Sequence, residues 1–559
     1  MFRRIKTFKS DLVFLRKILK TLSKDLKISL NKVHKVSLTS RQWSLLLKGW
    51  LDHYLIIVFY YWKLEKENKR KFLNNTIFFN SFKKNHIYYL YSYHFKKNIL
   101  KDIALFKKKK LFDGQINSNY KNFNFPIRED KFNDTDTIIV FIFKKFLYKI
   151  TRLILKVIPK VSFNYLLFKT CYSTNFLSKI YGIKYYFIIF YFHFVSNLNH
   201  LLVFFGKKDF EKRFLFAKEF EKKTIKIKNK SFKKYLYYRI SQDFPVYALE
   251  SFKIFFFKTV DIFKVNKIIS SYLHNFMNSY LKFWLVKNIK NTKFYFIEYG
   301  GAFRLDSFEY KIKEGITDKV ITWYQAKKKK QKQIYFSPLL YKYSRNIKSD
   351  ENLESYNLGI ILKDCTITNS FFVEGTSYED SFEIFENLKK LKTYLRSDIS
   401  KNFLIKNPIY FNEKNNSHAV YKKFFGTNAF FSTKKENLLE RNKDFFDKCR
   451  LIITVYPETT LSELIQINKP FICYLRYSYS SFLKEDLNMI KAFERAKILF
   501  NNPLKLSKHI NSVWDNPSNW FYSESNQKIL NLFKKNYLGI TNSNTILRKD
   551  KFKNFFNTI

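Results

Sequence analysis

The segment that decides the fold is residues 451–475, which read LIITVYPETTLSELIQINKPFICYL. Two short apolar runs, Leu451–Val455 and Phe471–Leu475, flank a stretch with helical spacing from about Thr460 to Asn468. A strand, a helix and a second strand of these lengths are typical of a βαβ unit, whose two strands run parallel. The segment therefore predicts a parallel sheet in the C-terminal half of the chain.

The same alternation of strands and helices continues upstream. A capping-box pattern at Ser377 and Asp380 precedes a helical apolar face. Further strands are expected at five apolar runs, namely Phe294–Ile297, Val320–Trp323, Ile334–Phe336, Leu358–Leu362 and Phe403–Ile405. The pattern predicts an α/β protein in which ligands bind beyond the carboxyl ends of the strands.

The N-terminal half is less regular. Residues 10–72 read as helices, since leucines and isoleucines between Leu15 and Leu26 recur every three or four positions. Residues 73–250 are rich in aromatic residues and lysine and show weak periodicity. Together with the breaks in composition, these patterns predict four regions, namely 1–72 (helical entry), 73–340 (N-terminal α/β domain), 350–500 (C-terminal α/β domain) and 501–545 (C-terminal helices).

The chain is strongly basic. Its 559 residues include 103 Lys and Arg against 46 Asp and Glu, which gives a net charge of +57. Lys, Asn, Ile, Phe and Tyr all have AT-rich codons, so genomic composition explains much of this excess. No nucleic-acid recognition motif accompanies the charge, so we expect no specific nucleic-acid partner. A basic surface nevertheless attracts anionic membranes, which are an expected partner.

Two further features indicate the compartment. Four scattered cysteines suit a reducing environment and hence a cytoplasmic location. Residues 185–205 carry no formal charge but include two histidines, two asparagines and a serine. These polar groups favour a buried or interfacial helix over a membrane span.

The strongest candidate site is the segment from Tyr456 to Glu463, where a strand ends and a helix begins. The unpaired N–H groups of the first helical turn suit a diphosphate, and hydroxyls there add hydrogen-bond donors. Glu463 is placed to accept hydrogen bonds from ribose hydroxyls. The candidate residues are Glu458, Thr459, Thr460, Ser462 and Glu463. In the alternative interpretation, Thr460 and Glu463 form only a capping box.

A second candidate site is Glu298-Tyr299-Gly300-Gly301, at the end of a predicted strand. The two glycines permit a sharp turn and a close approach of substrate to the backbone. The alternative is an ordinary turn that ends the strand. Asp134-Thr135-Asp136 precedes its apolar run and is expected to be a loop, and the nine histidines lack metal-ligand spacing, so no metal site is predicted.

Four blocks of residues resemble a family of transferases encoded in bacterial surface-polysaccharide gene clusters. The blocks are Leu30-Asn31-x-x-His34 with Arg41-Gln42-Trp43 and Gly49-Trp50-Leu51; Glu298-Tyr299-Gly300-Gly301 with Glu314, Asp318 and Thr322-Trp323; Cys449-Arg450-Leu451 through Glu463 to Asn468-x-Pro470; and His509-Ile510-Asn511, Trp514-Asp515, Trp520 and Phe533. That family is similar to two-domain GT-B glycosyltransferases and, distantly, to the glycerophosphotransferases of teichoic acid synthesis.

The resemblance implies a GT-B-like fold, in which two Rossmann-like domains face a cleft and extra helices lie at both termini. It implies transfer of a sugar or related group from a nucleotide-activated donor, without a metal or other cofactor, to a surface-polysaccharide or lipid-linked glycan acceptor. Glu298 and Tyr299 would act on the acceptor hydroxyl. Gly300, Gly301, Lys406 and the segment 458–463 would bind the donor.

The sequence departs from the family pattern at several positions. Tyr299 stands where the family usually has a histidine that is suited to general-base catalysis, and Lys406 replaces an arginine. The further strand that usually precedes the helical entry is not found here. These departures leave two alternatives open, namely a catalytically degenerate binding or assembly relative, and a basic protein that binds membranes or nucleic acid.

Overall fold

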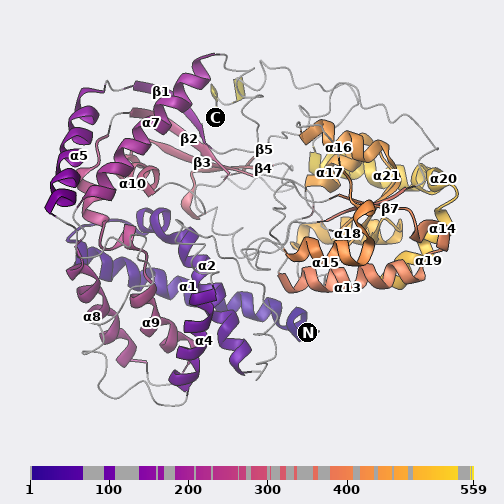
Figure 1. Ribbon diagram of the computed structural model, residues 1–559, viewed down its shortest axis with the longest axis horizontal. Helices are drawn as coiled ribbons and strands as arrows, with labels where there is room; N and C mark the ends of the chain where they lie inside the picture. The colour runs from indigo at the N-terminus through magenta and orange to yellow at the C-terminus, as the bar shows by residue number, and fades with distance from the viewer. Residues whose placement is uncertain are drawn as a thin grey trace. The chain divides into compact units, whose positions relative to one another are not determined.

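The structure is a computed structural model. It describes residues 3–66, 93–107, 138–158, 161–168, 183–206, 209–227, 231–261, 263–271, 279–298, 303, 315–322, 333–335, 357–362, 378–406, 416–432, 438–455, 459–475, 482–538, 554–555 and 557–558. The chain forms two compact units. The first comprises residues 13–296 and 312–318, and the second comprises residues 1–12, 297–311 and 319–559. The predicted α/β class is confirmed, because both sheets contain parallel strands and helices dominate the rest (Figure 1).

Two long helices open the chain, as the leucine pattern predicts. They are α1 (Arg3–His34) and α2 (Ser40–Lys66). Leu15, Leu22 and Leu26 lie on the buried face of α1. The irregular middle of the sequence supplies further helices, namely α4 (Tyr93–Lys107), α5 (Ile138–Val157), α7 (Ile183–Phe205), α8 (Glu211–Ile225), α9 (Phe232–Asp243) and α10 (Ser279–Asn288).

The first sheet has the strand order β1-β2-β3-β4-β5. Its strands are β1 (Val161–Phe168), β2 (Phe263–Ser270), β3 (Lys293–Ile297), β4 (Lys319–Thr322) and β5 (Gln333–Tyr335). The pairs β1–β2, β2–β3 and β4–β5 are parallel. The three strands predicted between residues 294 and 336 are confirmed. The other two, β1 and β2, come from residues in which lysine and aromatic side chains hide the alternation.

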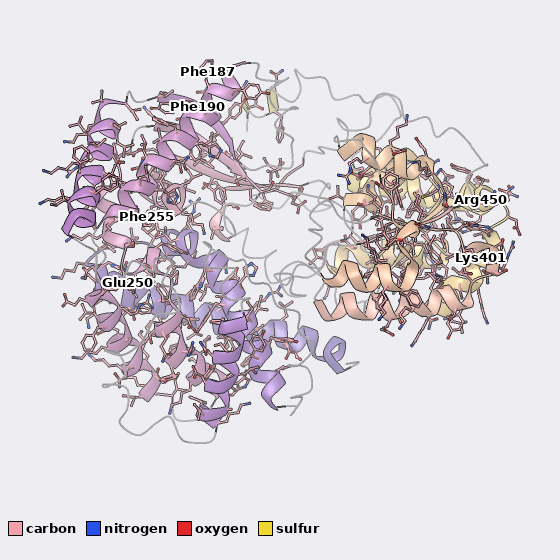
Figure 2. The ribbon with its side chains drawn as sticks, viewed as in Figure 1. Phe187, Phe190, Glu250, Phe255, Lys401 and Arg450 are labelled. Atoms are coloured by element: carbon pink, nitrogen blue, oxygen red, sulfur yellow. The ribbon has the colours of Figure 1, made fainter. Side chains whose placement is uncertain are left out.

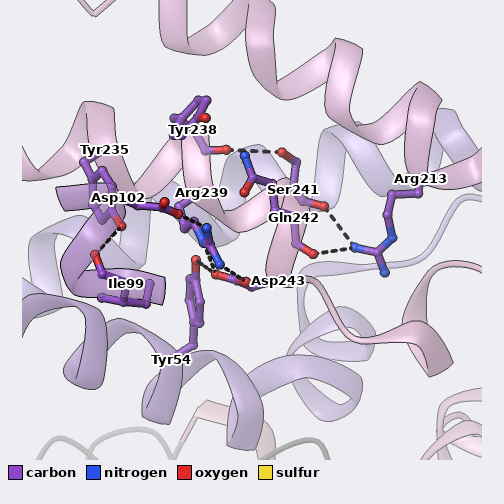
Figure 3. Close-up of polar contacts among 10 residues, drawn as sticks. All are labelled: Tyr54, Ile99, Asp102, Arg213, Tyr235, Tyr238, Arg239, Ser241, Gln242 and Asp243. Carbon is purple, nitrogen blue, oxygen red and sulfur yellow. Dashed lines mark hydrogen bonds and ion pairs between the residues drawn. The ribbon is translucent and has the colours of Figure 1, made fainter. Parts of the chain in front are cut away.

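Buried ion pairs hold the helices of the first unit together. Arg213 on α8 forms a bidentate pair with Glu250, which lies within the helical region (Figure 2). The same guanidinium donates to the carbonyl oxygens of Ser241, Gln242 and Phe244 at 2.7–3.1 Å. These carbonyls lie at the end of α9, where the last turn of a helix leaves oxygens without helical partners (Figure 3). Arg213 therefore closes α9 and neutralises a buried carboxylate at once.

A second arginine joins three helices. Arg239 on α9 donates two hydrogen bonds to Asp243, at 2.8 and 2.9 Å, and pairs with Asp102 on α4. Tyr54 on α2 donates to the same Asp243 carboxylate at 3.0 Å (Figure 3). Because nearly every polar atom of the group has a partner, the cost of burying these charges is offset.

The second sheet is parallel throughout and has the order β10-β9-β8-β6-β7. Its strands are β6 (Asn357–Ile361), β7 (Phe403–Lys406), β8 (Cys449–Thr454), β9 (Phe471–Tyr474) and β10 (Leu499–Phe500). The strands predicted at 358–362, 403–405, 451–455 and 471–475 are all confirmed. Leu358, Ile360 and alternate residues of neighbouring strands form one core with α13 (Tyr378–Tyr394) and α19 (Pro503–Val513).

The opposite face of this sheet carries α16 (Leu438–Asp447) and α17 (Thr459–Ile467). A Cβ atom at Gly359 would lie 2.6 Å from Cys449 Sγ on β8 and 3.1 Å from a ring carbon of Phe445 on α16. Glycine is therefore required in the middle of β6, because this helix and the neighbouring strand approach closely.

Asparagine followed by proline begins two helices near the C-terminus. Asn502 caps α19 by accepting from Leu504 N and Lys505 N, both at 3.0 Å, and Pro503 follows. Asn516 and Pro517 begin α20 (Pro517–Phe521) in the same way. Other α-helices in the described part of the chain are α14 (Ser397–Ser400), α15 (Asn416–Phe425), α18 (Leu487–Arg495) and α21 (Glu524–Phe533).

Replacing Arg213 by methionine is expected to destabilise the first unit strongly. The substitution leaves Glu250 buried without its cation and leaves three carbonyls of α9 unpaired, a loss of about 3–5 kcal/mol. Urea unfolding followed by circular dichroism measures the change. Arg396→Met is the matched control, because Arg396 forms exposed ion pairs with Asp398 and Asp515 and should leave the midpoint nearly unchanged. Equal effects of the two substitutions would contradict the assigned role.

Candidate functional site

The carboxyl edge of the second sheet brings one of the predicted donor residues to a defined position. Lys406, the last residue of β7, pairs with Ile361, the last residue of β6. Ile361 also pairs with Thr454, the last residue of β8. The three residues therefore form one row at the carboxyl edge, and α17 begins five residues after Thr454, at Thr459.

A chain of hydrogen bonds links this edge to α17. The ammonium group of Lys406 donates to Asn442 Oδ1 on α16, and it also lies 5.6 Å from the ring centroids of Phe445 and Phe446. Asn442 Nδ2 donates to Glu463 Oε2 on α17 at 2.9 Å. The structure thus brings together two of the predicted residues, Lys406 and Glu463, through a third that was not predicted.

The chemistry of the chain sets its direction. An ionised carboxylate only accepts hydrogen bonds and an ammonium only donates them. The Asn442 amide must therefore turn its NH₂ toward Glu463 and its oxygen toward Lys406. The positive charge of Lys406 is thereby held at the strand end, where the side chain is only half-buried.

The other predicted donor residues of the segment 458–463 are described in part. Glu463 is 2% exposed and Ser462 is fully buried. Thr459 and Thr460, in the first turn of α17, are half-buried. Glu458 lies outside the described residues. The N-terminus of α17 carries the partial positive charge of a helix start, which suits an anion.

The second candidate site is described only in part. Glu298 follows β3, is half-buried, and its backbone N–H donates to the Ile321 carbonyl of β4 at 3.0 Å. Tyr299, Gly300 and Gly301 lie outside the described residues, as do Asp134, Thr135 and Asp136. In the ranges that the structure describes, no three His, Cys, Asp or Glu side chains are grouped to hold a metal ion.

The two described thiols of the second sheet are structural. Cys449 on β8 and Cys473 on β9 are buried and unbonded to each other. Burial raises the pKa of both thiols well above the ordinary value. A thiol that stays protonated is a poor nucleophile, so both act as small apolar side chains of the sheet.

The family model of the LIC12162 family transferases matches residues 2–552. The chain belongs to this family. The family name confirms the predicted transferase class. No curated protein matches the chain.

In this LIC12162 family transferase, the first block of motif residues builds a turn between α1 and α2. Asn31 Oδ1 accepts from Leu38 N at 3.2 Å and from Trp43 Nε1 at 2.7 Å, while Asn31 Nδ2 donates to Leu38 O at 3.0 Å. His34 stacks on Phe252 with ring centroids 4.0 Å apart. Its Nε2 donates to the carbonyl oxygen of Ala248 at 3.1 Å. These residues serve the fold.

A second contact joins the first motif block to the middle one. Arg41 Nη2 donates to Asp318 Oδ2 at 2.6 Å, and Arg41 Nε donates to the Ile316 carbonyl at 3.2 Å. The same Asp318 oxygen accepts from Phe294 N on β3 at 2.8 Å. Asp318 therefore holds the start of α2 against β3.

The C-terminal motif residues of the transferase pack around the second sheet. The guanidinium of Arg450 lies 5.6 Å from the Trp514 ring centroid, and its Nη1 donates to the Trp514 carbonyl at 3.3 Å. Trp520 Nε1 donates to the Ala496 carbonyl at 3.1 Å and the ring lies edge-on to His509. Asn468 has a left-handed φ of 54° and ends α17.

Gly359→Ala is expected to destabilise the second sheet by about 1–3 kcal/mol, because the new methyl group overlaps Cys449 Sγ. Urea unfolding of the transferase measures this change. Gly315→Ala is the control, since a Cβ atom there meets nothing within 4 Å. An unchanged urea midpoint for Gly359→Ala would contradict the close packing of Gly359 against Cys449 and Phe445.

Acid should destabilise the first unit through His34. The pKa of His34 is lowered to about 4, mainly by burial and to a smaller extent by nearby Lys212, against the raising effect of the Ala248 hydrogen bond. The folded state keeps the ring neutral while the unfolded state protonates near pH 6.5, so stability falls as the pH drops from about 6.5 to about 4. The total loss is on the order of 3 kcal/mol.

Urea midpoints between about pH 7 and pH 5 test this dependence. His34→Phe should reduce the pH dependence, leaving the part that comes from His509, whose pKa burial also lowers to about 4. His193→Gln, at an exposed position of α7, should retain the full dependence. A native pH dependence in His34→Phe would assign the effect to other groups.

Proposed function

We propose that this transferase moves a sugar or related group from a nucleotide-activated donor to a surface-polysaccharide or lipid-linked glycan acceptor, within a GT-B-like fold. The observation that carries the proposal is the Lys406–Asn442–Glu463 chain at the carboxyl edge of a parallel sheet. Ligands of open parallel sheets bind at this edge. The proposal also rests on the resemblance of the four motif blocks.

The donor diphosphate would lie between Lys406 and the N-terminus of α17. A lysine ammonium supplies a point charge for phosphate, and the first-turn N–H groups with the Thr459 and Thr460 hydroxyls supply hydrogen bonds. These groups would stabilise the negative charge that develops on the leaving nucleoside diphosphate. Glu458, Ser462, Gly300 and Gly301 complete the proposed donor side.

Glu463 has two possible parts in this proposal. As a donor ligand, its carboxylate would accept from the ribose hydroxyls. As a positioning residue, it would act through Asn442, whose amide it orients toward Lys406. Glu463→Gln separates the two, because glutamine can still orient an amide by accepting, whereas ribose recognition by a charged carboxylate is lost.

Glu298 and Tyr299 would act on the acceptor hydroxyl. An ordinary tyrosine has a pKa near 10 and is a weak base at neutral pH. Glu298 is the better base of the two. Tyr299 stands where the family usually has a histidine. This difference supports a second candidate function, that of a relative that binds the donor without catalysing transfer.

A thermal-shift screen with the UDP, GDP, CDP and dTDP forms of nucleotides and nucleotide-sugars tests the donor site. One nucleotide family should raise the unfolding midpoint, since a ligand at 100 times its Kd adds about 2.7 kcal/mol of stability. Lys406→Gln should weaken that binding by roughly tenfold to a hundredfold, because a charge-assisted hydrogen bond is lost.

Lys401→Gln is the matched control, because Lys401 is exposed and lies just before β7 (Figure 2). It should bind the nucleotide as the native chain does. A well-folded sample that responds to no nucleotide, or equal losses in the two lysine variants, would contradict the donor site. Donor binding without release of nucleoside diphosphate in the presence of glycan acceptors would favour the non-catalytic relative.

A further inference from the structure

The outer surface of the first unit carries an apolar face on two helices, α5 and α7, which pack against each other. On α5, large apolar side chains are exposed from Ile142 to Val157, with Leu153 66% and Val157 75% exposed. The exposed set on α5 is Ile142, Phe143, Phe146, Ile150, Leu153, Ile154 and Val157. Thr151 and Leu155 are its buried residues among those whose side chains are described.

Helix α5 turns its apolar side chains away from the core of the first unit. At about 100° per residue, the seven exposed apolar side chains fall within an arc of about 120°. Thr151 and Leu155 point to the other side of the helix. A surface helix of a globular protein turns its apolar stripe inward. Here the stripe points outward, so something other than this unit's core is expected to cover it.

Helix α7 adds a second exposed stripe. Phe187 and Phe190 are 67% and 69% exposed and lie together near the start of the helix (Figure 2). The stripe continues along one face at Phe194 and Leu201, and the rings of Phe190 and Phe194 are stacked with centroids 6.1 Å apart. His193 and Asn197 are exposed on the same face. Aromatic rings mixed with polar groups suit the headgroup region of a bilayer.

Charge identifies the occupant of this face. Lys145, Lys149, Arg152 and Lys156 of α5 are exposed and flank its apolar arc. Residues 138–157 and 183–205 contain no Asp or Glu. A helix with an apolar stripe beside a purely basic one binds at the surface of membranes that contain anionic lipid. Within the described ranges, no helix is both long and apolar enough to cross a bilayer.

We propose that the exposed faces of α5 and α7 form a docking surface for an anionic membrane. The aromatic and aliphatic side chains insert among the headgroups, and the basic side chains of α5 contact the lipid phosphates. The proposal goes beyond the donor site and does not depend on it, since none of its residues belongs to the carboxyl edge of the second sheet.

Co-sedimentation of the full chain with vesicles tests the docking surface. Vesicles of equimolar phosphatidylcholine and phosphatidylglycerol should bind the protein far better than pure phosphatidylcholine. The triple variant Lys145→Gln, Lys149→Gln, Lys156→Gln should weaken binding by about a hundredfold, at about fivefold for each charge. The triple variant Phe146→Ser, Ile150→Ser, Leu153→Ser should weaken it by more than about tenfold.

Matched controls remove the effect of overall charge and hydrophobicity. Lys401→Gln, Lys443→Gln, Lys508→Gln removes the same charge from exposed sites of the second unit, and Tyr394→Ser, Leu504→Ser, Leu532→Ser removes exposed apolar side chains there. Both controls should bind vesicles like the native chain. Equal weakening in a control and its matched test variant would overturn the proposal.

A direct contact measurement keeps the test independent of folding losses. Phe190→Trp should add tryptophan fluorescence that vesicles of brominated phosphatidylglycerol quench. The fluorescence added by Leu532→Trp should not be quenched. Absence of quenching at residue 190 would overturn the proposal. A second outcome would also overturn the proposal, namely that the native chain is a dimer and that the serine triple variant is a monomer with unchanged vesicle binding. The face would then be an interface between copies of the chain.

Discussion

Parallel pairing on both sides of β6 aligns the ends of β7 and β8 at the carboxyl edge of the second sheet. Ile361 pairs with Lys406 on one side and with Thr454 on the other. A slip of one residue would turn Lys406 to the other face, away from Asn442. Gly359 makes this register possible, because any larger residue would push β8 and α16 away. The close packing of Gly359 and the position of the Lys406 ammonium group thus both depend on the register of β6.

The C-terminal half was largely predictable, because four of its five strands are short, mostly apolar runs between helices with clear faces. The two-residue strand β10 was not predicted. Apolar runs and helical periodicity did not predict the elements in residues 138–168 and 263–270. The apolar stripe of α5 points outward, so helical periodicity there does not mark a core face, and the lysines of β2 at 264 and 267 break the apolar run of a sheet strand. The order of strands in both sheets depends on long-range pairing that no local pattern contains.

The candidate site was predictable in part for a similar reason. Glu463 was singled out from its place at a helix start, and Lys406 from the family resemblance. Asn442 was missed, because an isolated asparagine carries no signal and its contacts lie 36 and 21 residues away in sequence. Its spacing from Phe445 and Phe446 does place the three side chains on one face of α16. Such spacing identifies neighbours of a site only once the site is known.

A lysine-rich, phenylalanine-rich composition is accommodated in the fold by pairing the two residue types. The ammonium of Lys392 lies 5.4–5.8 Å from the ring centroids of Phe403, Phe424 and Phe425. Lys389 lies 5.5 Å from those of Phe385 and Phe424. Cation–π contacts let lysine stems cover aromatic surface while the charge stays near water. Some of the positive charge is therefore part of the packing.

The contact between Arg41 and Asp318 also has a consequence for the order of events during synthesis. The two residues are 277 positions apart. At ~5–20 residues per second, a ribosome needs roughly 15–55 s to travel from one to the other. During that interval the start of α2 lacks its contact with Asp318. The apolar faces of α1 and α2 stay uncovered until the later segments that pack on them have been synthesised. The nascent chain thus has a long window in which chaperones or a membrane can meet its helices before the first unit closes.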